Sequence, residues 1–120
     1  MHVSTPRWPA RALGAGHLGW GIACLVRPQA IAGLAGVPAR TAGRRFVQVL
    51  GARHVATGLA LVALPARLTA RLTAGVDATH ALSMVGLALE DGSERTSALL
   101  NAAAAGGWWV AARAVSKGMD

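Results

Sequence analysis

The stretch RRFVQVLGARHVATGLALVALP, residues 44–65, decides the fold of this chain. As a helix rising ~1.5 Å per residue, about 20 mostly apolar residues cross the ~30 Å hydrocarbon core of a bilayer. The segment ends at Pro65, which disrupts a helix that has begun before it. Arg53 and His54 lie at its centre, where ionisable groups are costly unless they face a partner, a cavity or a ligand. The stretch therefore predicts a membrane-spanning helix with a polar site at its middle.

Three further segments of similar length surround this helix, at about residues 9–26, 66–90 and 94–116. Between the first and second segments, residues 29–39 are punctuated by Gly and Pro, and Ile31, Leu34 and Val37 recur every three residues. That recurrence suits a short helix lying at the membrane interface. Short connections favour antiparallel neighbours, and neither strand-like alternation nor an internal repeat is evident. The prediction is an all-α single domain, residues 1–120. Its fold is a four-helix antiparallel transmembrane bundle with a short interfacial segment between the first two helices.

The composition favours a membrane protein over a soluble one. Apolar residues make up 53% of the chain and charged residues only 14%, below the roughly 25% typical of soluble domains. Ala and 15 Gly suit helix interfaces in membranes, because small residues let backbones approach closely. We expect a multi-pass protein of the inner (plasma) membrane. A soluble Ala-rich bundle stays the alternative, because Ala and Gly contribute little transfer free energy.

The net charge of +7 is distributed at the ends of the apolar segments, in pairs such as Arg44/Arg45 and Arg113/Lys117. This pattern suits anionic lipid head groups, not nucleic acid. The expected partner is the lipid bilayer, with a homo-oligomer or a larger membrane complex as further partners. Four spans place both termini on one side, and the basic residues, six against five, favour cytoplasmic termini. The lone Cys24 excludes an internal disulfide and a CxxC metal site.

Polar residues from the first three long segments fall in one central layer, and Asn101 on the fourth can hydrogen-bond across the bundle. Helix rise places His17 and His54 roughly 15 Å below one membrane face, and His80 roughly 14 Å below the other. An ion pair between Arg53 and Asp77 would make both charges less costly in hydrocarbon. Asp77 lies three residues before His80, on the same helix face, where its carboxylate could hold that imidazole in one tautomer. The predicted polar cluster comprises His17, Arg53, His54, Asp77, His80 and Asn101.

Three interpretations of this cluster stay open: a structural hydrogen-bond network, a ligand or substrate site, and a proton or ion relay. The cofactor is unknown, and haem b is the sharpest hypothesis, because imidazoles on two helices can ligate iron. His17, His54 and His80 are the candidate ligands, and the same side chains could enter a zinc site. The glycines at 14, 21, 51 and 58 would either make room for a porphyrin or pack helices closely.

Two other patterns have structural interpretations. Small residues spaced by four, including those at Gly19 and Gly106, mark close helix crossings within the bundle or between protomers. Trp8 and the pair Trp108-Trp109 are typical of interfacial anchors.

Two short motifs carry a resemblance to a known family. They are the Gly-x-Arg-His-x-x-x-Gly element at residues 51–58 and the Val-Asp-x-x-His element at residues 76–80. These resemble uncharacterised small four-helix integral membrane proteins of actinobacteria, which show G-x-R-[DH]-x-x-x-G in the second helix and V-D-x-x-[DH] in the third. The resemblance implies a four-span fold and gives weight to Arg53, His54, Asp77 and His80, but it implies no activity.

The sequence therefore favours a small membrane accessory or scaffold protein without catalysis. The alternatives are a haem- or quinone-associated anchor of a redox complex and a small dimeric transporter. An enzyme is disfavoured, because no Ser/His/Asp order, phosphate loop or pair of carboxylates at a useful spacing is present.

Overall fold

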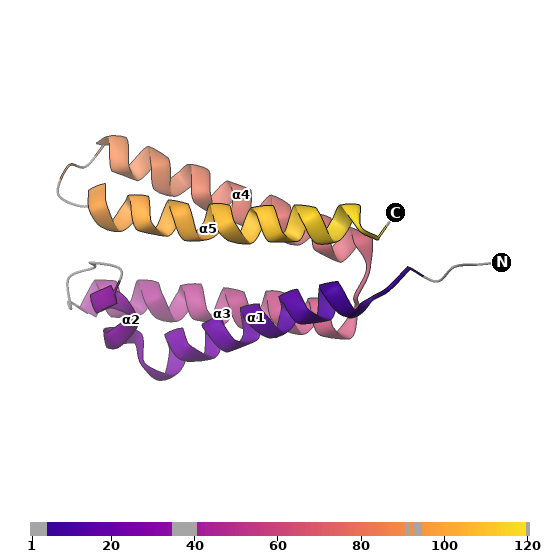
Figure 1. Ribbon diagram of the computed structural model, residues 1–120. Coiled ribbons are helices and arrows are strands. Elements are labelled where there is room, and N and C mark those ends of the chain that lie inside the picture. Colours follow the sequence, from indigo (N-terminus) through magenta and orange to yellow (C-terminus); the bar gives the residue numbers. More distant parts are fainter. Residues whose placement is uncertain (1–4, 35–40, 91, 93–94, 120) are drawn as a thin grey trace.

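The computed structural model describes residues 5–34, 41–90, 92 and 95–119. These residues form five helices and no strand: α1 (Trp8–Val26), α2 (Pro28–Leu34), α3 (Thr41–Ala63), α4 (Arg67–Glu90) and α5 (Arg95–Lys117) (Figure 1). The predicted all-α class is confirmed, and the long helices begin and end within about three residues of the predicted bounds. The predicted start of the last helix at Glu94, and the interfacial segment beyond residue 34, lie outside the described residues.

Prolines explain most helix boundaries. Pro9 occupies the first turn of α1, where a missing N–H costs nothing. The N–H of Arg27 donates the last hydrogen bond of this region to Ala23 (2.9 Å), and Pro28 then begins α2 in a new direction. Pro65 lies in the turn between the end of α3 and the start of α4. The two turns thus follow from local backbone chemistry alone.

The four long helices are arranged as two hairpins. Here α1 packs along α3 and α4 packs along α5, while the contacts between these two pairs are sparser. Figure 1 shows the pairs as two layers, with Trp8 of α1 and Lys117 of α5 at the same end of the molecule. We call α1 and α3 the first hairpin and α4 and α5 the second hairpin. The side chains that bridge the two hairpins therefore determine how they are held together.

Glycine contacts hold the first hairpin together. A Cβ atom added at Gly58 would lie 2.6 Å from the carbonyl oxygen of Gly14, and one added at Gly21 would lie 2.7 Å from that of Gly51. Real Cβ atoms do not approach this closely, so the two backbones touch at both places. These four glycines therefore pack helices closely, which was one of the two roles that the sequence offered. Gly19 and Gly106, by contrast, have no neighbour within 4 Å of an added Cβ, so they mark no crossing between the five described helices.

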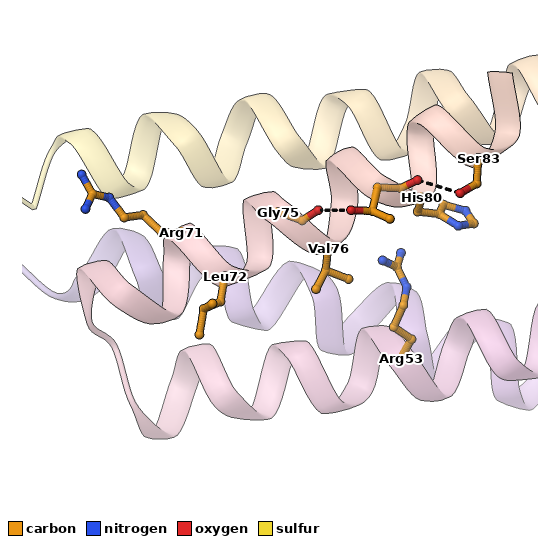
Figure 2. Close-up of a pocket in the computed structure, with 8 residues that line it drawn as sticks. Arg53, Arg71, Leu72, Gly75, Val76, His80 and Ser83 are labelled. Carbon is orange, nitrogen blue, oxygen red and sulfur yellow. Dashed lines mark hydrogen bonds between the residues drawn. The ribbon is translucent and has the colours of Figure 1, made fainter. Parts of the chain in front are cut away.

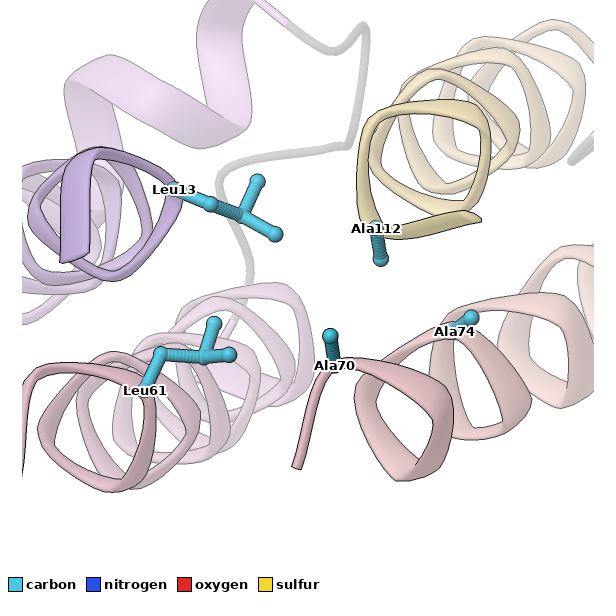
Figure 3. Close-up of a cluster of buried hydrophobic side chains, with 5 residues drawn as sticks. All are labelled: Leu13, Leu61, Ala70, Ala74 and Ala112. Carbon is cyan, nitrogen blue, oxygen red and sulfur yellow. The ribbon is translucent and has the colours of Figure 1, made fainter. Parts of the chain in front are cut away.

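Near the chain termini, the hairpins meet through large side chains set against small ones. Leu13 and Leu61 of the first hairpin point towards the second hairpin, whose helices present alanines (Figure 3). These alanines are Ala70, Ala74 and Ala112. Leu61 is fully buried, so this cluster closes one end of the interface between the hairpins.

The rest of the surface is unusually apolar. Leu, Val and Trp side chains project outward from every long helix, among them Val26, Val49, Leu82 and Leu89, each at least 70% exposed. The buried apolar side chains are mostly Ala, and the buried polar ones include His17, His54 and Asp77. Two helical segments, Gly43–Ala63 and Arg67–Glu90, are long and apolar enough to cross a membrane.

Candidate polar site

A short repeat positions two histidines face to face. Residues 14–21 (GAGHLGWG) and 51–58 (GARHVATG) share the pattern GAxHxxxG, a repeat that the sequence analysis overlooked. Because α1 and α3 are antiparallel, Gly14 meets Gly58 and Gly21 meets Gly51. The histidine between each pair of glycines then faces the other helix. His17 and His54 accordingly lie in contact, with their Nδ1 atoms 2.7 Å apart.

Four side chains form a ring around this contact, with hydrogen-bond distances at three of its four links. Arg53 Nη2 lies 3.2 Å from His54 Nε2, and Arg53 Nη1 donates to Asp77 Oδ1, also at 3.2 Å. The second carboxylate oxygen of Asp77, Oδ2, lies 3.8 Å from His17 Nε2. We call Arg53, His54, His17 and Asp77 the polar ring. The predicted Arg53–Asp77 ion pair is confirmed, and it joins the first hairpin to the second.

The chemistry of arginine gives the ring one direction. A guanidinium only donates hydrogen bonds, so His54 Nε2 accepts and the hydrogen of a neutral His54 sits on Nδ1. That N–H donates to Nδ1 of His17, which places the His17 hydrogen on Nε2, facing Asp77. The chain of donors therefore runs from Arg53 through His54 and His17 to the carboxylate of Asp77. Two doubly protonated imidazoles would oppose two donors at 2.7 Å, so the contact excludes that state.

One link of the ring is open. At 3.8 Å, the His17 Nε2 to Asp77 Oδ2 separation is beyond a direct hydrogen bond. Both atoms are buried and have no hydrogen-bond partner among the residues that the structure describes, and the same holds for Arg53 Nε. The side chains of His17 and Asp77 are 0% and 1% exposed, so bulk water does not reach this link. A modest approach of the second hairpin would close it.

Trp108 belongs to the site, although the sequence assigned it to the membrane interface. Its ring centroid lies 4.1 Å from that of His17 and 5.7 Å from that of His54. An added Cβ at Gly16 would lie 3.2 Å from the Trp108 ring, so the glycine makes room for the indole. Trp108 therefore covers the histidine pair from α5, while Trp8 and Trp109 are exposed. Hydropathy could not predict this contact between Gly16 and the Trp108 ring.

His80 and Asn101 lie next to the ring without entering it. Together with Arg53 and His54 they line a small central cavity of about 20 Å³ between the hairpins, large enough for one water molecule. Asn101 donates to the carbonyl of Ser97 on its own helix (2.9 Å), not across the bundle. His80 stacks near Phe46, with ring centroids 6.5 Å apart. The prediction that the Asp77 carboxylate fixes the tautomer of the His80 imidazole is wrong, because Asp77 pairs with Arg53 and faces His17.

This geometry bears on the metal and haem hypotheses. Metal–imidazole bonds of about 2 Å place two nitrogens that ligate opposite sides of an iron about 4 Å apart, whereas the Nδ1 atoms of His17 and His54 are in direct hydrogen-bond contact. The glycines that could have made room for a porphyrin are filled by helix backbone. Among the described residues, no group of three His, Cys, Asp or Glu side chains is placed to hold a metal ion. The His17–His54 pairing thus does not fit an axial pair as it stands.

Comparison with known proteins adds no assignment: no protein family, no curated protein and no solved structure matches this chain.

Proposed function

We propose that this chain is a small integral protein of the inner membrane that crosses the bilayer four times and acts as a non-catalytic accessory or scaffold protein. Both termini lie on the cytoplasmic side in this proposal. In this proposal α1 and α5 cross the membrane paired with α3 and α4, which contain the two segments that are long and apolar enough to do so.

The observation that carries the proposal is the placement of polar and apolar groups. Large apolar side chains such as Leu82 and Leu89 are more than 70% exposed, while His17, His54 and Asp77 are at most 2% exposed. In water this arrangement would have two free-energy costs. Apolar surface would stay exposed to solvent, and the buried polar groups would lose their hydration. In a bilayer, the same arrangement puts lipid against Leu and Val and turns the polar groups towards one another.

The polar ring supports a structural role. It connects α1 to α3 through the two histidines and α3 to α4 through the Arg53–Asp77 pair, between hairpins that pack together more sparsely than the helices within each. Paired and hydrogen-bonded charges of this kind specify one relative placement of helices. A scaffold needs such a fixed outer surface for its neighbours.

Small residues on the outer surface support association with other helices. Gly19 and Gly106 have open space around them, and small residues let a second helix approach closely in a membrane. In this proposal these positions serve contacts with a second copy or another membrane protein.

The membrane location is tested by expressing the full chain and washing the isolated membranes with alkaline carbonate. We expect the protein to stay in the membrane pellet and to leave it only with detergent. A protein that is monodisperse in buffer without detergent would contradict the membrane proposal and favour the Ala-rich soluble bundle.

The scaffold role is tested by Gly106→Leu, with Gly58→Leu as the matched comparison. We expect Gly106→Leu to keep the fold and to lose a stable association seen with the wild type, whereas Gly58→Leu should disrupt the fold itself. An association that survives both Gly106→Leu and Gly19→Leu would remove these positions from the contact surface.

A further inference from the structure

A groove between α3 and α4 opens on the outer side of the molecule (Figure 2). Its volume is about 620 Å³, within the 300–1,000 Å³ usual for small-molecule sites. Leu72, Gly75 and Val76 form an apolar wall along α4. Arg53 and His80 lie at its polar end, between the two helices. The groove therefore presents an apolar surface next to two hydrogen-bonding side chains.

The polar end has hydrogen-bond donors to spare. Arg53 uses two of its five N–H groups, one for Asp77 and one for His54. The His80 imidazole makes no hydrogen bond to any described residue. The hydroxyls of Thr79 and Ser83, which also line this end, donate to backbone carbonyls of their own helix, at 2.8 Å each. An occupant that suits this end must carry acceptor atoms.

Three further properties of the occupant follow, given the membrane location proposed above. It enters from the bilayer, because the groove opens on the surface that faces lipid. The part that meets Arg53 is uncharged, because Asp77 already offsets the charge of Arg53 at 3.2 Å, while Arg71 lines the opposite end of the groove. Its body is apolar, because Leu72 and Val76 are 62% and 45% exposed along the groove. Leaving the donors unpaired in hydrocarbon would cost several kcal/mol.

We propose that the α3–α4 groove binds the ring of an isoprenoid quinone, whose carbonyl oxygens accept hydrogen bonds from His80 and Arg53. The quinone ring lies against Leu72 and Val76, and its isoprenoid tail extends into the surrounding lipid. The polar ring holds Arg53 in place for this contact, so Arg53 belongs both to the polar ring and to the α3–α4 groove. The proposal concerns binding and includes no electron transfer.

The test uses the full chain in phosphatidylcholine nanodiscs and a short-tailed ubiquinone analogue, titrated calorimetrically against empty nanodiscs. The wild type should bind one analogue per chain. His80→Leu removes a donor without touching the polar ring and should weaken binding at least tenfold. Val76→Trp fills the groove and should abolish binding, whereas Leu89→Trp, on the same helix but outside the groove, should leave binding unchanged. Binding that is equal in all four proteins, or no stronger than in empty nanodiscs, overturns the proposal.

A second readout is the carbonyl stretch of the 13C-labelled analogue. Hydrogen bonding should lower its frequency in the wild type, and one of the shifted bands should be lost in His80→Leu. Ester carbonyls of phospholipid offer the same acceptor chemistry, so the titration is repeated in ether-linked lipids. Quinone binding seen only in ether lipids would assign the groove to a phospholipid ester instead. A chain that does not assemble into nanodiscs refutes the membrane location, whereas one that assembles but binds no quinone refutes this site alone.

Discussion

At the scale of single residues, Arg53 is what makes two equivalent histidines unequal. The GAxHxxxG repeats are related by an approximate two-fold axis between α1 and α3, and such an axis alone would let the shared hydrogen sit on either Nδ1. In the third position of the pattern α3 carries Arg53 and α1 carries Gly16. Because Arg53 donates to His54 Nε2, it selects one direction for the whole ring.

The first prediction concerns these tautomers. In 15N-histidine-labelled protein, His54 should carry its hydrogen on Nδ1 and His17 on Nε2, because of the donor order that begins at Arg53. Nitrogen-15 NMR of the protein in nanodiscs distinguishes the protonated from the unprotonated nitrogen of each ring, and His54→Gln provides the assignment. In the double variant Arg53→Leu/Asp77→Leu, which removes the directing donor without leaving a lone charge, both tautomers of each histidine should appear. A single unchanged tautomer in that variant would refute the directing role of Arg53.

The second prediction concerns the ion pair. Asp77→Leu alone leaves the Arg53 charge without its partner in the interior, and the loss of one member of a buried pair costs roughly 3–5 kcal/mol. The double variant Arg53→Leu/Asp77→Leu should be less destabilised than Asp77→Leu, because neither charge remains. Unfolding in detergent, followed by helical circular dichroism, gives the free energies for a double-mutant cycle. Additive costs of the two single variants would show that the two side chains are not coupled.

Residue types and helix rise predict part of this site. They place five of the six polar residues, all but Asn101, in one central layer, and they predict the Arg53–Asp77 pair because a long side chain at that depth reaches a carboxylate. They do not predict which histidines touch, because rise gives depth but not the rotation of each helix about its axis. The unknown rotation of each helix also explains why the role of Trp108 was not predicted. Its position late in the chain suits an interface anchor, and only the orientation of α5 in the structure shows that Trp108 covers His17.

At the scale of helices, the glycines determine which helices pair. Gly14, Gly21, Gly51 and Gly58 allow backbone contact over two turns of α1 and α3, and this contact brings the histidines within hydrogen-bond distance. Helix ends are predictable from Pro28 and Pro65, since proline acts through local sterics. Which helix packs against which is not predictable, because Ala and Gly occur in every helix and the sequence is compatible with several pairings.

The third prediction compares two glycines. Gly58→Ala should destabilise the fold by roughly 1–3 kcal/mol, the usual cost of overpacking, because the new Cβ would lie 2.6 Å from the Gly14 carbonyl oxygen. Gly19→Ala, where an added Cβ meets no atom within 4 Å, should change stability by less than about 0.5 kcal/mol. Denaturant titrations of both variants in detergent measure the difference. Equal effects would mean that the close approach of α1 and α3 is not what stabilises the first hairpin.

At the scale of the whole molecule, the start of α1 and the end of α5 lie at the same end of the structure, so the proposed four-span arrangement places both on one side of the membrane. Trp8 and Lys117 lie at the same end of the structure (Figure 1). The fourth prediction is that a fluorescent protein fused to either terminus fluoresces, since it folds on the cytoplasmic side, while alkaline phosphatase fused at the same places stays inactive. Fluorescence from one terminus only would indicate an odd number of spans, and activity of both phosphatase fusions would reverse the orientation.

The approximate two-fold relation between α1 and α3 also has a consequence for synthesis at high levels. Each helix presents the same glycine and histidine surface, and α3 of one copy fits α1 of another as well as it fits its own. Two chains can therefore exchange these helices and form an intertwined dimer that repeats every contact of the monomer, the general route of domain swapping. The concentration of the chain, more than any side chain in the interior, then controls how much protein is trapped in the exchanged form.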